Sequence, residues 1–264
     1  MDVTSVSDFA SRFAPVIAAH RTGAFLAGDM LAALTLHVAG PLSIAWAPFD
    51  YVPVTARLVV VGITPGRQQA ENALSAFRDA LAAGATPEEA SRRAKFTGAF
   101  SGPMRDNLIA MLDHVGAQRA LGVASCATLF DPNRNLLHLT SALRHPVFVA
   151  GENYNGAPDM LRTSVLRTMV ETHLVAEARA LPTALWLPLG SKPSAALRHL
   201  VSLGVLDADR VLGGLPHPSG ANGERIAYFL GRKLRAALSP KTLPEPLDRA
   251  CDALRARLSQ LVAA

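Results

Sequence analysis

The sequence predicts an α/β fold in which helices cover both faces of a short, mainly parallel sheet. Short apolar runs are followed by segments with helical periodicity, and this alternation occurs four times along the chain. Half of the 264 residues are apolar and 18% are charged, so the chain can bury a sizeable core. We therefore expect a three-layer α/β/α sandwich with a four-stranded, mainly parallel central sheet.

The first predicted strand is the β-branched run Leu58–Val61, which is too short for a helix and is stopped by Gly62. Because every residue in it is apolar, we expect it to be buried on both faces of the sheet. Three further strands are predicted at Leu136–Leu139, Ala184–Leu189 and Arg210–Leu215.

Helices are expected before, between and after these strands. Apolar periodicity and end signals predict them at Ser7–Ala19, Gly23–His37, Gly66–Gly84, from Thr86 onward, Met104–Val115, Asp159–Ala178, Pro193–Leu203, Asn222–Leu238 and Glu245–Val262. A long loop is expected over His145–Pro158. The apolar stretch between residues 31 and 49 is interrupted by Gly40 and Pro41, so we interpret it as buried helix and loop rather than a membrane span.

Charge and cysteine content limit the possible functions. A formal charge of +5 and an isoelectric point near 9.7 favour approach to polyanions such as nucleic acid. Two cysteines are too few for a disulfide framework, a four-thiolate zinc site or an iron–sulfur cluster. The N-terminal residues resemble no secretory signal. We therefore expect a cytoplasmic protein without a metal ion, a cofactor or a membrane partner.

In parallel sheets, the functional loops lie beyond the carboxyl ends of the strands. This rule selects four segments, which we expect to converge on one cleft: Gly62–Gln69, Ser141–Pro158, Gly190–Ser194 and Pro216–Arg225.

The first of these loops reads Gly62-Ile63-Thr64-Pro65-Gly66. Its glycines and proline permit a sharp bend and a close approach of the backbone to a ligand. An ordinary strand-to-helix turn is an equally good interpretation of this segment alone. It matches neither the phosphate-binding loop of nucleotide hydrolases nor a dinucleotide fingerprint. Phosphoryl transfer and nicotinamide chemistry are therefore less favoured.

The last loop holds a histidine between two prolines, Pro216-His217-Pro218. A rigid loop at a strand end is well suited to aim an imidazole into a cleft. A purely structural histidine remains an alternative. A metal role is weaker, since no second histidine or cysteine lies at ligand spacing.

Gly62-Ile63-Thr64-Pro65-Gly66 and His217-Pro218-Ser219-Gly220 together resemble the two signature motifs of the uracil-DNA glycosylase superfamily. Between them, Phe100-Ser101-Gly102 is similar to a third segment of its branches that carry an iron–sulfur cluster. The resemblance spans roughly Arg57 to Arg232. It implies a single glycosylase-like domain over residues 1–264, with an N-terminal helical extension at 1–56 and a C-terminal helix at 244–264.

The resemblance implies a monofunctional enzyme that flips deoxyuridine out of DNA and hydrolyses its N-glycosidic bond in base excision repair. His217 would donate a hydrogen bond to the departing uracil, and Phe100 would stack on the base, with Phe96 a rival. Thr64 stands where many members have Asp or Asn, so it could only hold the attacking water. Gln69 could contact base or water.

The remaining roles are divided between substrate and DNA. Gly62, Ile63 and Pro65 would form the substrate turn. Ser141 stands where the family has its uracil-reading Asn, so an amide would have to come from Asn153 or Asn155. The residues expected to meet DNA are Lys192, Ser219, Asn222 and Arg225.

Two alternatives to this function remain open. One is a catalytically weak protein of the same fold that binds a lesion or an abasic site, which the departures at Thr64 and Ser141 make plausible. The other is an enzyme that acts on another damaged base or on a free nucleoside. We expect a monomer in each case.

Overall fold

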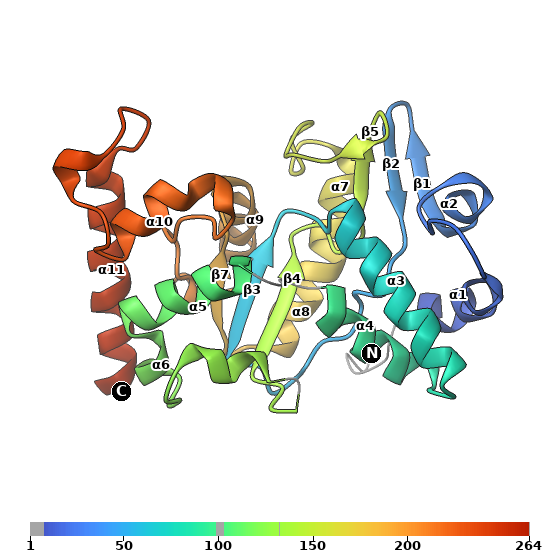
Figure 1. Cartoon of the computed structure of the whole chain (residues 1–264), viewed down its shortest axis with the longest axis horizontal. Coiled ribbons are helices and arrows are strands. Elements are labelled where there is room, and N and C mark those ends of the chain that lie inside the picture. The colour runs from blue at the N-terminus through green and yellow to red at the C-terminus, as the bar shows by residue number, and fades with distance from the viewer. Residues whose placement is uncertain (1–7, 99–102, 132, 264) are drawn as a thin grey trace. The chain divides into compact units, whose positions relative to one another are not determined.

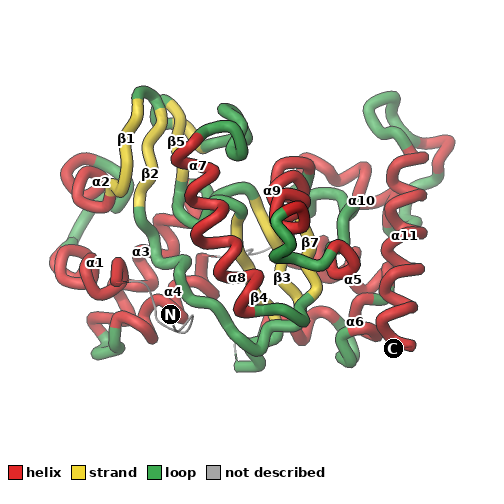
Figure 2. The backbone as a smooth tube through the Cα atoms, turned by 180° about the vertical axis from the view of Figure 1, so that it is seen from behind, coloured by secondary structure: helices red, strands yellow, loops and turns green. Residues whose placement is uncertain are grey.

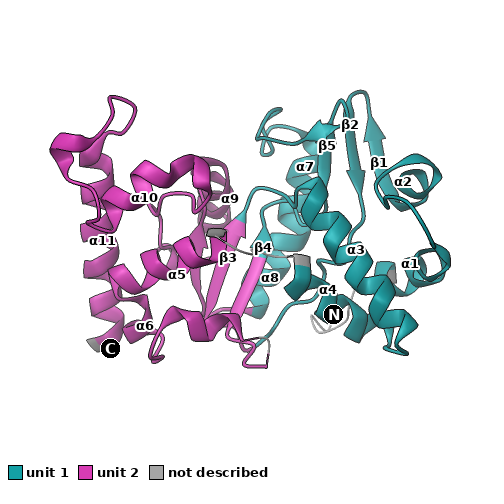
Figure 3. Ribbon diagram, viewed as in Figure 1, with its two compact units in different colours: residues 1–54, 62–99, 140–180 teal, residues 55–61, 100–139, 181–264 magenta. Residues whose placement is uncertain are grey.

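The computed structural model describes residues 8–98, 103–131 and 133–263. It is a mixed α/β protein with two separate sheets. Figure 3 shows that the chain divides into two compact units, unit 1 (1–54, 62–99 and 140–180) and unit 2 (55–61, 100–139 and 181–264). The backbone passes between the units five times, and two of these passages lie within strands β3 (Leu58–Gly62) and β4 (Leu137–Ser141).

Unit 2 contains a three-stranded sheet in the order β4-β3-β7, where β7 is Leu185–Pro188 (Figure 1). Strands β3 and β7 are parallel, with Leu58 opposite Leu185 and Val61 opposite Pro188. All four residues from Leu58 to Val61 are fully buried, which confirms the predicted first strand. The predicted second and third strands are also confirmed, at β4 and β7.

Helices of unit 2 surround this sheet. They are α5 (Pro103–Val115), α6 (Ala117–Ala120), α9 (Ser191–Ser202), α10 (Gly223–Phe229) and α11 (Pro244–Ala263). Of these, α9 contacts β7, and the others contribute apolar side chains to the core that contains β3 and β7. Leu58 and Val60 of β3 share one core with Leu108 of α5, Phe229 of α10 and Leu254 of α11. Figures 1 and 2 both show α11 running beside α6 and α10.

Unit 1 contains an antiparallel sheet in the order β1-β2-β5-β6. Its strands are β1 (Thr35–Ala39), β2 (Leu42–Ala45), β5 (Val147–Val149) and β6 (Glu152–Asn153). Its helices are α1 (Asp8–Ala19), α2 (Gly28–Leu34), α3 (Arg67–Ala82), α4 (Pro87–Gly98), α7 (Ser164–Met169) and α8 (Val175–Ala180). The core is aromatic at its centre, where the Trp46 ring meets Phe13 at 5.0 Å and Phe77 at 5.6 Å between centroids.

The expected fourth strand, Arg210–Leu215, is wrong as a strand. Only Val211 makes a parallel bridge, to Trp186 of β7. Gly214 adopts φ +109°, and Pro216 has no amide hydrogen, so the segment cannot continue the ladder.

The expected helix over Gly23–His37 is confirmed only over Gly28–Leu34 and is wrong on either side of it. Thr35 is extended and begins β1, and Gly40 at φ +58° forms the turn into β2. Together these strands form a hairpin within the N-terminal extension that we expected to be helical.

Two further segments differ from the prediction. The expected loop over His145–Pro158 contains β5 and β6, which pair with the β1–β2 hairpin through β2. The helix expected over Asn222–Leu238 ends at Phe229, because Gly231 takes φ +71° and Arg232 donates its backbone N–H to the carbonyl of Ala227 at 2.8 Å. Between α7 and α8, residues Val170–Leu174 form a short π-helix within the predicted long helix.

Candidate functional site

The first predicted loop lies in unit 1, at the point where β3 ends and α3 begins. Gly66 is the N-cap of α3, and its backbone N–H donates to Oε1 of Gln69 at 3.0 Å. Gln69, predicted to contact base or water, therefore uses its carbonyl oxygen to cap the helix. Pro65 is buried, whereas Gly62 and Ile63 are partly exposed. A Cβ added at Gly62 would lie 3.5 Å from Oγ of Ser141, so the predicted Ser141 lies beside this turn.

Thr64 fastens this turn to the segment that leads into β5. Its hydroxyl donates to the carbonyl of His145 at 3.0 Å and accepts the backbone N–H of Val147 at 3.2 Å. The only hydroxyl proton of Thr64 is thus used within the protein. A water molecule could bind Thr64 only as a donor to the remaining lone pair.

Asn153 of β6 also lies beside the turn. Its Oδ1 accepts the backbone N–H of Arg67, the first residue of α3, at 2.8 Å. Arg67 in turn donates to the carbonyls of Leu26 at 2.6 Å and Gly151 at 2.9 Å, and its guanidinium stacks over the Phe148 ring at 4.4 Å. The exposed side chain of Asn153 is therefore held at the amino end of α3.

Asn155, the other predicted amide, has a local role. Its Oδ1 accepts the backbone N–H of Ala157 at 3.3 Å, which closes a turn. The two amides are thus distinguished by the structure, since Asn153 lies at the Gly62–Gly66 turn and Asn155 braces its own loop.

The carbonyl that accepts the Thr64 hydroxyl belongs to a buried charge cluster in unit 1, which consists of Asp50, Lys95, Arg144, His145, His173 and Glu177. The Arg144 guanidinium contacts Oε1 of Glu177 at 2.6 Å and Oδ1 of Asp50 at 3.8 Å. Lys95 donates to the backbone carbonyls of Phe49 and Tyr51. Burial lowers the pKa of Lys95 to about 7, of His145 to about 3 and of His173 to about 4.

In unit 2, the loop with the predicted catalytic histidine is anchored by buried prolines and by a hydrogen bond from α5. Pro216 and Pro218 are buried, and Asn107 of α5 donates its amide to the carbonyl of Pro218 at 3.0 Å. The half-buried His217 ring accepts the backbone N–H of Ser219 at Nδ1, at 3.3 Å. Burial lowers the pKa of His217 below its usual value. Nδ1 can accept this bond only when it carries no proton, so the neutral ring holds its proton on Nε2.

The predicted DNA-contacting residues of this loop are bonded to one another. Asn222 donates its amide to Oγ of Ser219 at 3.3 Å and accepts a hydrogen bond from the exposed Arg225 at 3.2 Å. Arg225 also reaches the carbonyl of Lys241 at 3.4 Å. Lys192 lies in the first turn of α9. Phe100 lies outside the described residues.

Sequence reasoning missed one carboxylate that organises the surface next to this loop. Glu224 of α10 accepts hydrogen bonds from Lys233 at 2.7 Å, from the amide and hydroxyl of Ser239 at 3.1 and 2.5 Å, and from Thr242 at 2.6 Å. The bond from Lys233, together with the others, holds the pKa of Glu224 well below its usual range. No local sequence pattern predicts this role, because the hydrogen-bond partners of Glu224 lie up to 18 residues along the chain.

The predicted site residues therefore fall into two groups. Unit 1 brings together Gly62, Thr64, Gln69, Ser141 and Asn153 at one turn, and unit 2 brings together His217, Ser219, Asn222 and Arg225 in one loop. The convergence of the two groups on one cleft remains a prediction. Missed residues that position the groups are Arg67, Asn107 and His145, which are recognisable only from their contacts in the folded chain.

Neither a metal centre nor a reactive thiol is found in the part of the chain that the structure describes. It contains no group of three or more His, Cys, Asp or Glu side chains that could hold a metal ion. Burial and the neighbouring Asp113 raise the pKa of the Cys126 thiol far above its usual value. None of the described helices combines the length and the apolar character that crossing a bilayer requires.

One curated protein with a similar sequence was found. "Uncharacterized protein YoxB" of Bacillus subtilis (strain 168) is 37% identical over 201 residues, which make up 75% of this chain and 78% of the relative. The chain belongs to the YoxB family. No protein-family model matches it, and no solved structure matches it.

The similarity to YoxB must extend into both units, because 201 aligned residues exceed the length of either unit. Membership of the YoxB family thus applies to the two-unit chain rather than to one half of it. The name of YoxB states no activity.

Proposed function

We propose that the protein is a monofunctional DNA glycosylase that removes uracil from DNA and leaves an abasic site. The observation that carries this proposal is the hydrogen bond from the Ser219 amide to Nδ1 of His217. It leaves a neutral imidazole with its donor proton on Nε2, and no partner for Nε2 occurs among the described residues. A neutral, fixed donor suits the stabilisation of a leaving base.

The reaction develops charge in a way that such a donor can assist. As the N-glycosidic bond breaks, its electron pair moves onto the base, whose O2 becomes negative while the sugar becomes positive. A hydrogen bond from Nε2 to this oxygen strengthens as the charge grows, so it lowers the barrier. A water molecule then forms a bond to the sugar carbon, and the proton that it loses passes through solvent to the uracil anion.

The turn in unit 1 supports the recognition part of the proposal. Asn153 presents an amide next to Gly66, whose built Cβ would lie 3.9 Å from its Nδ2. Since Oδ1 already accepts the Arg67 amide, the Nδ2 group is available to donate to O4 of a uracil. Phe100 remains the proposed stacking residue, and Thr64 the proposed water ligand through its second lone pair.

For the contacts with DNA, we propose Lys192, Ser219, Asn222 and Arg225, which would position the phosphates. The net charge of +5 favours this association.

The proposal also includes the finer fold of the superfamily, a three-layer α/β/α sandwich in which Val211 stands where a fourth strand would lie. It further includes a monomer that acts in the cytoplasm and needs no cofactor.

The test is a uracil-containing duplex oligonucleotide, incubated with the protein and then treated with hot alkali to cleave abasic sites. We expect excision by the wild type and a loss of at least about 100-fold in His217→Ala, because one preorganised donor is worth about 2.7–4 kcal/mol. His37→Ala, a partly buried histidine of β1 in unit 1, is the matched control and should retain activity. Unchanged turnover in His217→Ala would remove the catalytic assignment.

The Thr64 hydroxyl donates its proton to the His145 carbonyl, so it cannot also donate to a water molecule. This favours one second candidate, a protein that binds a lesion or an abasic site without turnover. A mobility shift on uracil-containing or abasic DNA without any strand cleavage after alkali would support this binder over the enzyme. Cleavage of free nucleosides alone, or of duplexes with another damaged base, would point to the remaining substrate classes.

A further inference from the structure

Unit 2 contains a pocket of about 310 Å³ that is separate from the His217 loop. It lies at the amino ends of the parallel strands, since Arg57 directly precedes β3, Leu185 is the first residue of β7, and Arg210 precedes Val211. Functional loops of such sheets are expected at the opposite, carboxyl ends. The pocket is therefore distinct from the loops that are expected to carry out the excision of uracil.

Two guanidinium groups line this pocket, and the described residues around it include no carboxylate side chain. Nη1 of Arg57 donates to the carbonyl of Leu121 at 2.5 Å, and Nη1 of Arg210 donates to the carbonyl of Thr183 at 2.6 Å. Neither arginine forms an ion pair within the described ranges of the chain. Each bond fixes the orientation of a planar group that has five N–H donors, so most of the donors remain available.

The other walls of the pocket are chiefly apolar, with Leu121, Leu185 and Leu261 among them. A small site with apolar walls and a few fixed polar groups is the usual form of a ligand pocket. Two cations that form no ion pair with any described residue match a ligand with a doubly negative group, and the apolar walls match an uncharged organic group.

We infer that this pocket binds a small phosphate monoester, with its phosphate held by Arg57 and Arg210 and its organic group against the leucine side chains. Phosphate is preferred to a single carboxylate because its three terminal oxygens and two negative charges can engage both guanidinium forks at once. This site is independent of the proposed excision of uracil, since none of its residues belongs to the His217 loop or to the Thr64 turn.

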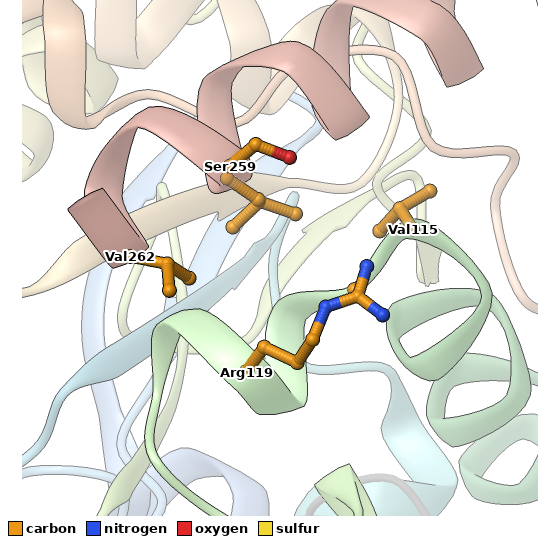
Figure 4. A pocket seen from close by; sticks show the side chains of 6 residues that line it. Val115, Arg119, Ser259 and Val262 are labelled. Carbon is orange, nitrogen blue, oxygen red and sulfur yellow. The ribbon is translucent and has the colours of Figure 1, made fainter.

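A neighbouring pocket provides a matched control. It has a volume of about 130 Å³ and is also lined by one arginine, Arg119 of α6, together with Ser259 and Val262 of α11. Figure 4 shows the Arg119 side chain in this pocket, below the end of α11. Arg119→Gln removes one positive charge from the same region and leaves both arginines of the larger pocket unchanged.

The test is titration calorimetry of the full chain with phenyl phosphate at constant ionic strength, with benzoate and benzyl alcohol as comparison ligands. We expect phenyl phosphate to bind more tightly than benzoate, and benzyl alcohol not to bind. Arg57→Gln and Arg210→Gln should each weaken binding by about tenfold or more, because each removes charge-assisted hydrogen bonds. Arg119→Gln and His217→Ala should retain the wild-type affinity.

The variant Ala120→Glu covers the case in which the loss of an arginine prevents folding. Ala120 lines the pocket and is only partly buried, so we expect a carboxylate there to pair with the guanidinium groups and abolish phosphate binding while both arginines remain. Failure of phenyl phosphate to bind the wild type would overturn the inference. Equal affinity in wild type, Arg57→Gln and Arg210→Gln would do so as well, and neither result would bear on uracil excision.

Discussion

Ser219 controls the state of His217 through its backbone amide rather than through its side chain. Its φ of −68° is the angle that proline also adopts, so Ser219→Pro removes the N–H donor with little change in this torsion. We expect excision of uracil to fall by about tenfold, since the lost hydrogen bond both orients the ring and selects the Nε2–H tautomer. Ser219→Ala keeps the amide and should have a smaller effect.

Ser219→Pro should also change how the activity depends on pH. Only the imidazole that is unprotonated at Nδ1 can accept the Ser219 amide, so this bond favours the neutral form of His217. Its removal should raise the pKa of His217, and the loss of activity on acidification should begin at a higher pH than in the wild type. Identical acid limbs in kcat/KM for Ser219→Pro and the wild type would contradict this tautomer assignment.

Lys95 gives a stability prediction. Burial lowers its pKa to about 7 in the folded protein, whereas an unfolded chain has the ordinary value of 10.5. Between these values the unfolded state binds more protons, so the free energy of unfolding should rise with pH and level off above 10.5. Lys95→Met should flatten this slope in urea titrations at several pH values. An equally steep slope in the variant would mean that another group near Glu177 and Arg144 is responsible.

At the scale of the element, Thr64 joins the start of α3 to the chain that leads into β5. Thr64→Val removes both hydrogen bonds and leaves the His145 carbonyl and the Val147 amide without their partner. We expect a loss of about 1–3 kcal/mol in the free energy of unfolding, measured by denaturant titration. Thr64→Ser restores the hydroxyl and should recover most of the stability. An unchanged free energy of unfolding in Thr64→Val would show that these two hydrogen bonds do not stabilise the fold.

Elements with an uninterrupted pattern could be predicted from the sequence. Leu58–Val61 is apolar throughout and became β3, and the glycines and prolines around Gly66 correctly indicated a turn into a helix. The segment Thr35–Ala45 was misassigned. Its hairpin is stabilised by the pairing of β2 with β5, and β5 lies so far along the chain that the residues around Thr35 do not reveal it. The position of Asn153 at the amino end of α3 depends on the same long-range pairing.

At the scale of the whole molecule, the interleaved chain predicts that neither unit is stable as a fragment. Residues 181–264 form the longest segment of unit 2, yet its core also needs Leu58 and Val60 of β3 and Leu108 of α5. We expect an isolated polypeptide of residues 181–264 to lack cooperative unfolding, as measured by circular dichroism during heating. A sharp, reversible transition in this fragment would contradict the role assigned to β3.

The passage of the backbone between the units also shapes how the protein is made. During synthesis, the fully buried strand Leu58–Val61 leaves the ribosome well before Leu185 of its neighbour β7. Vectorial folding, in which an N-terminal domain closes before the next is translated, is therefore not open to this chain. The nascent polypeptide must carry an uncovered apolar strand segment for much of translation, and such a segment is prone to aggregate until its neighbours cover it.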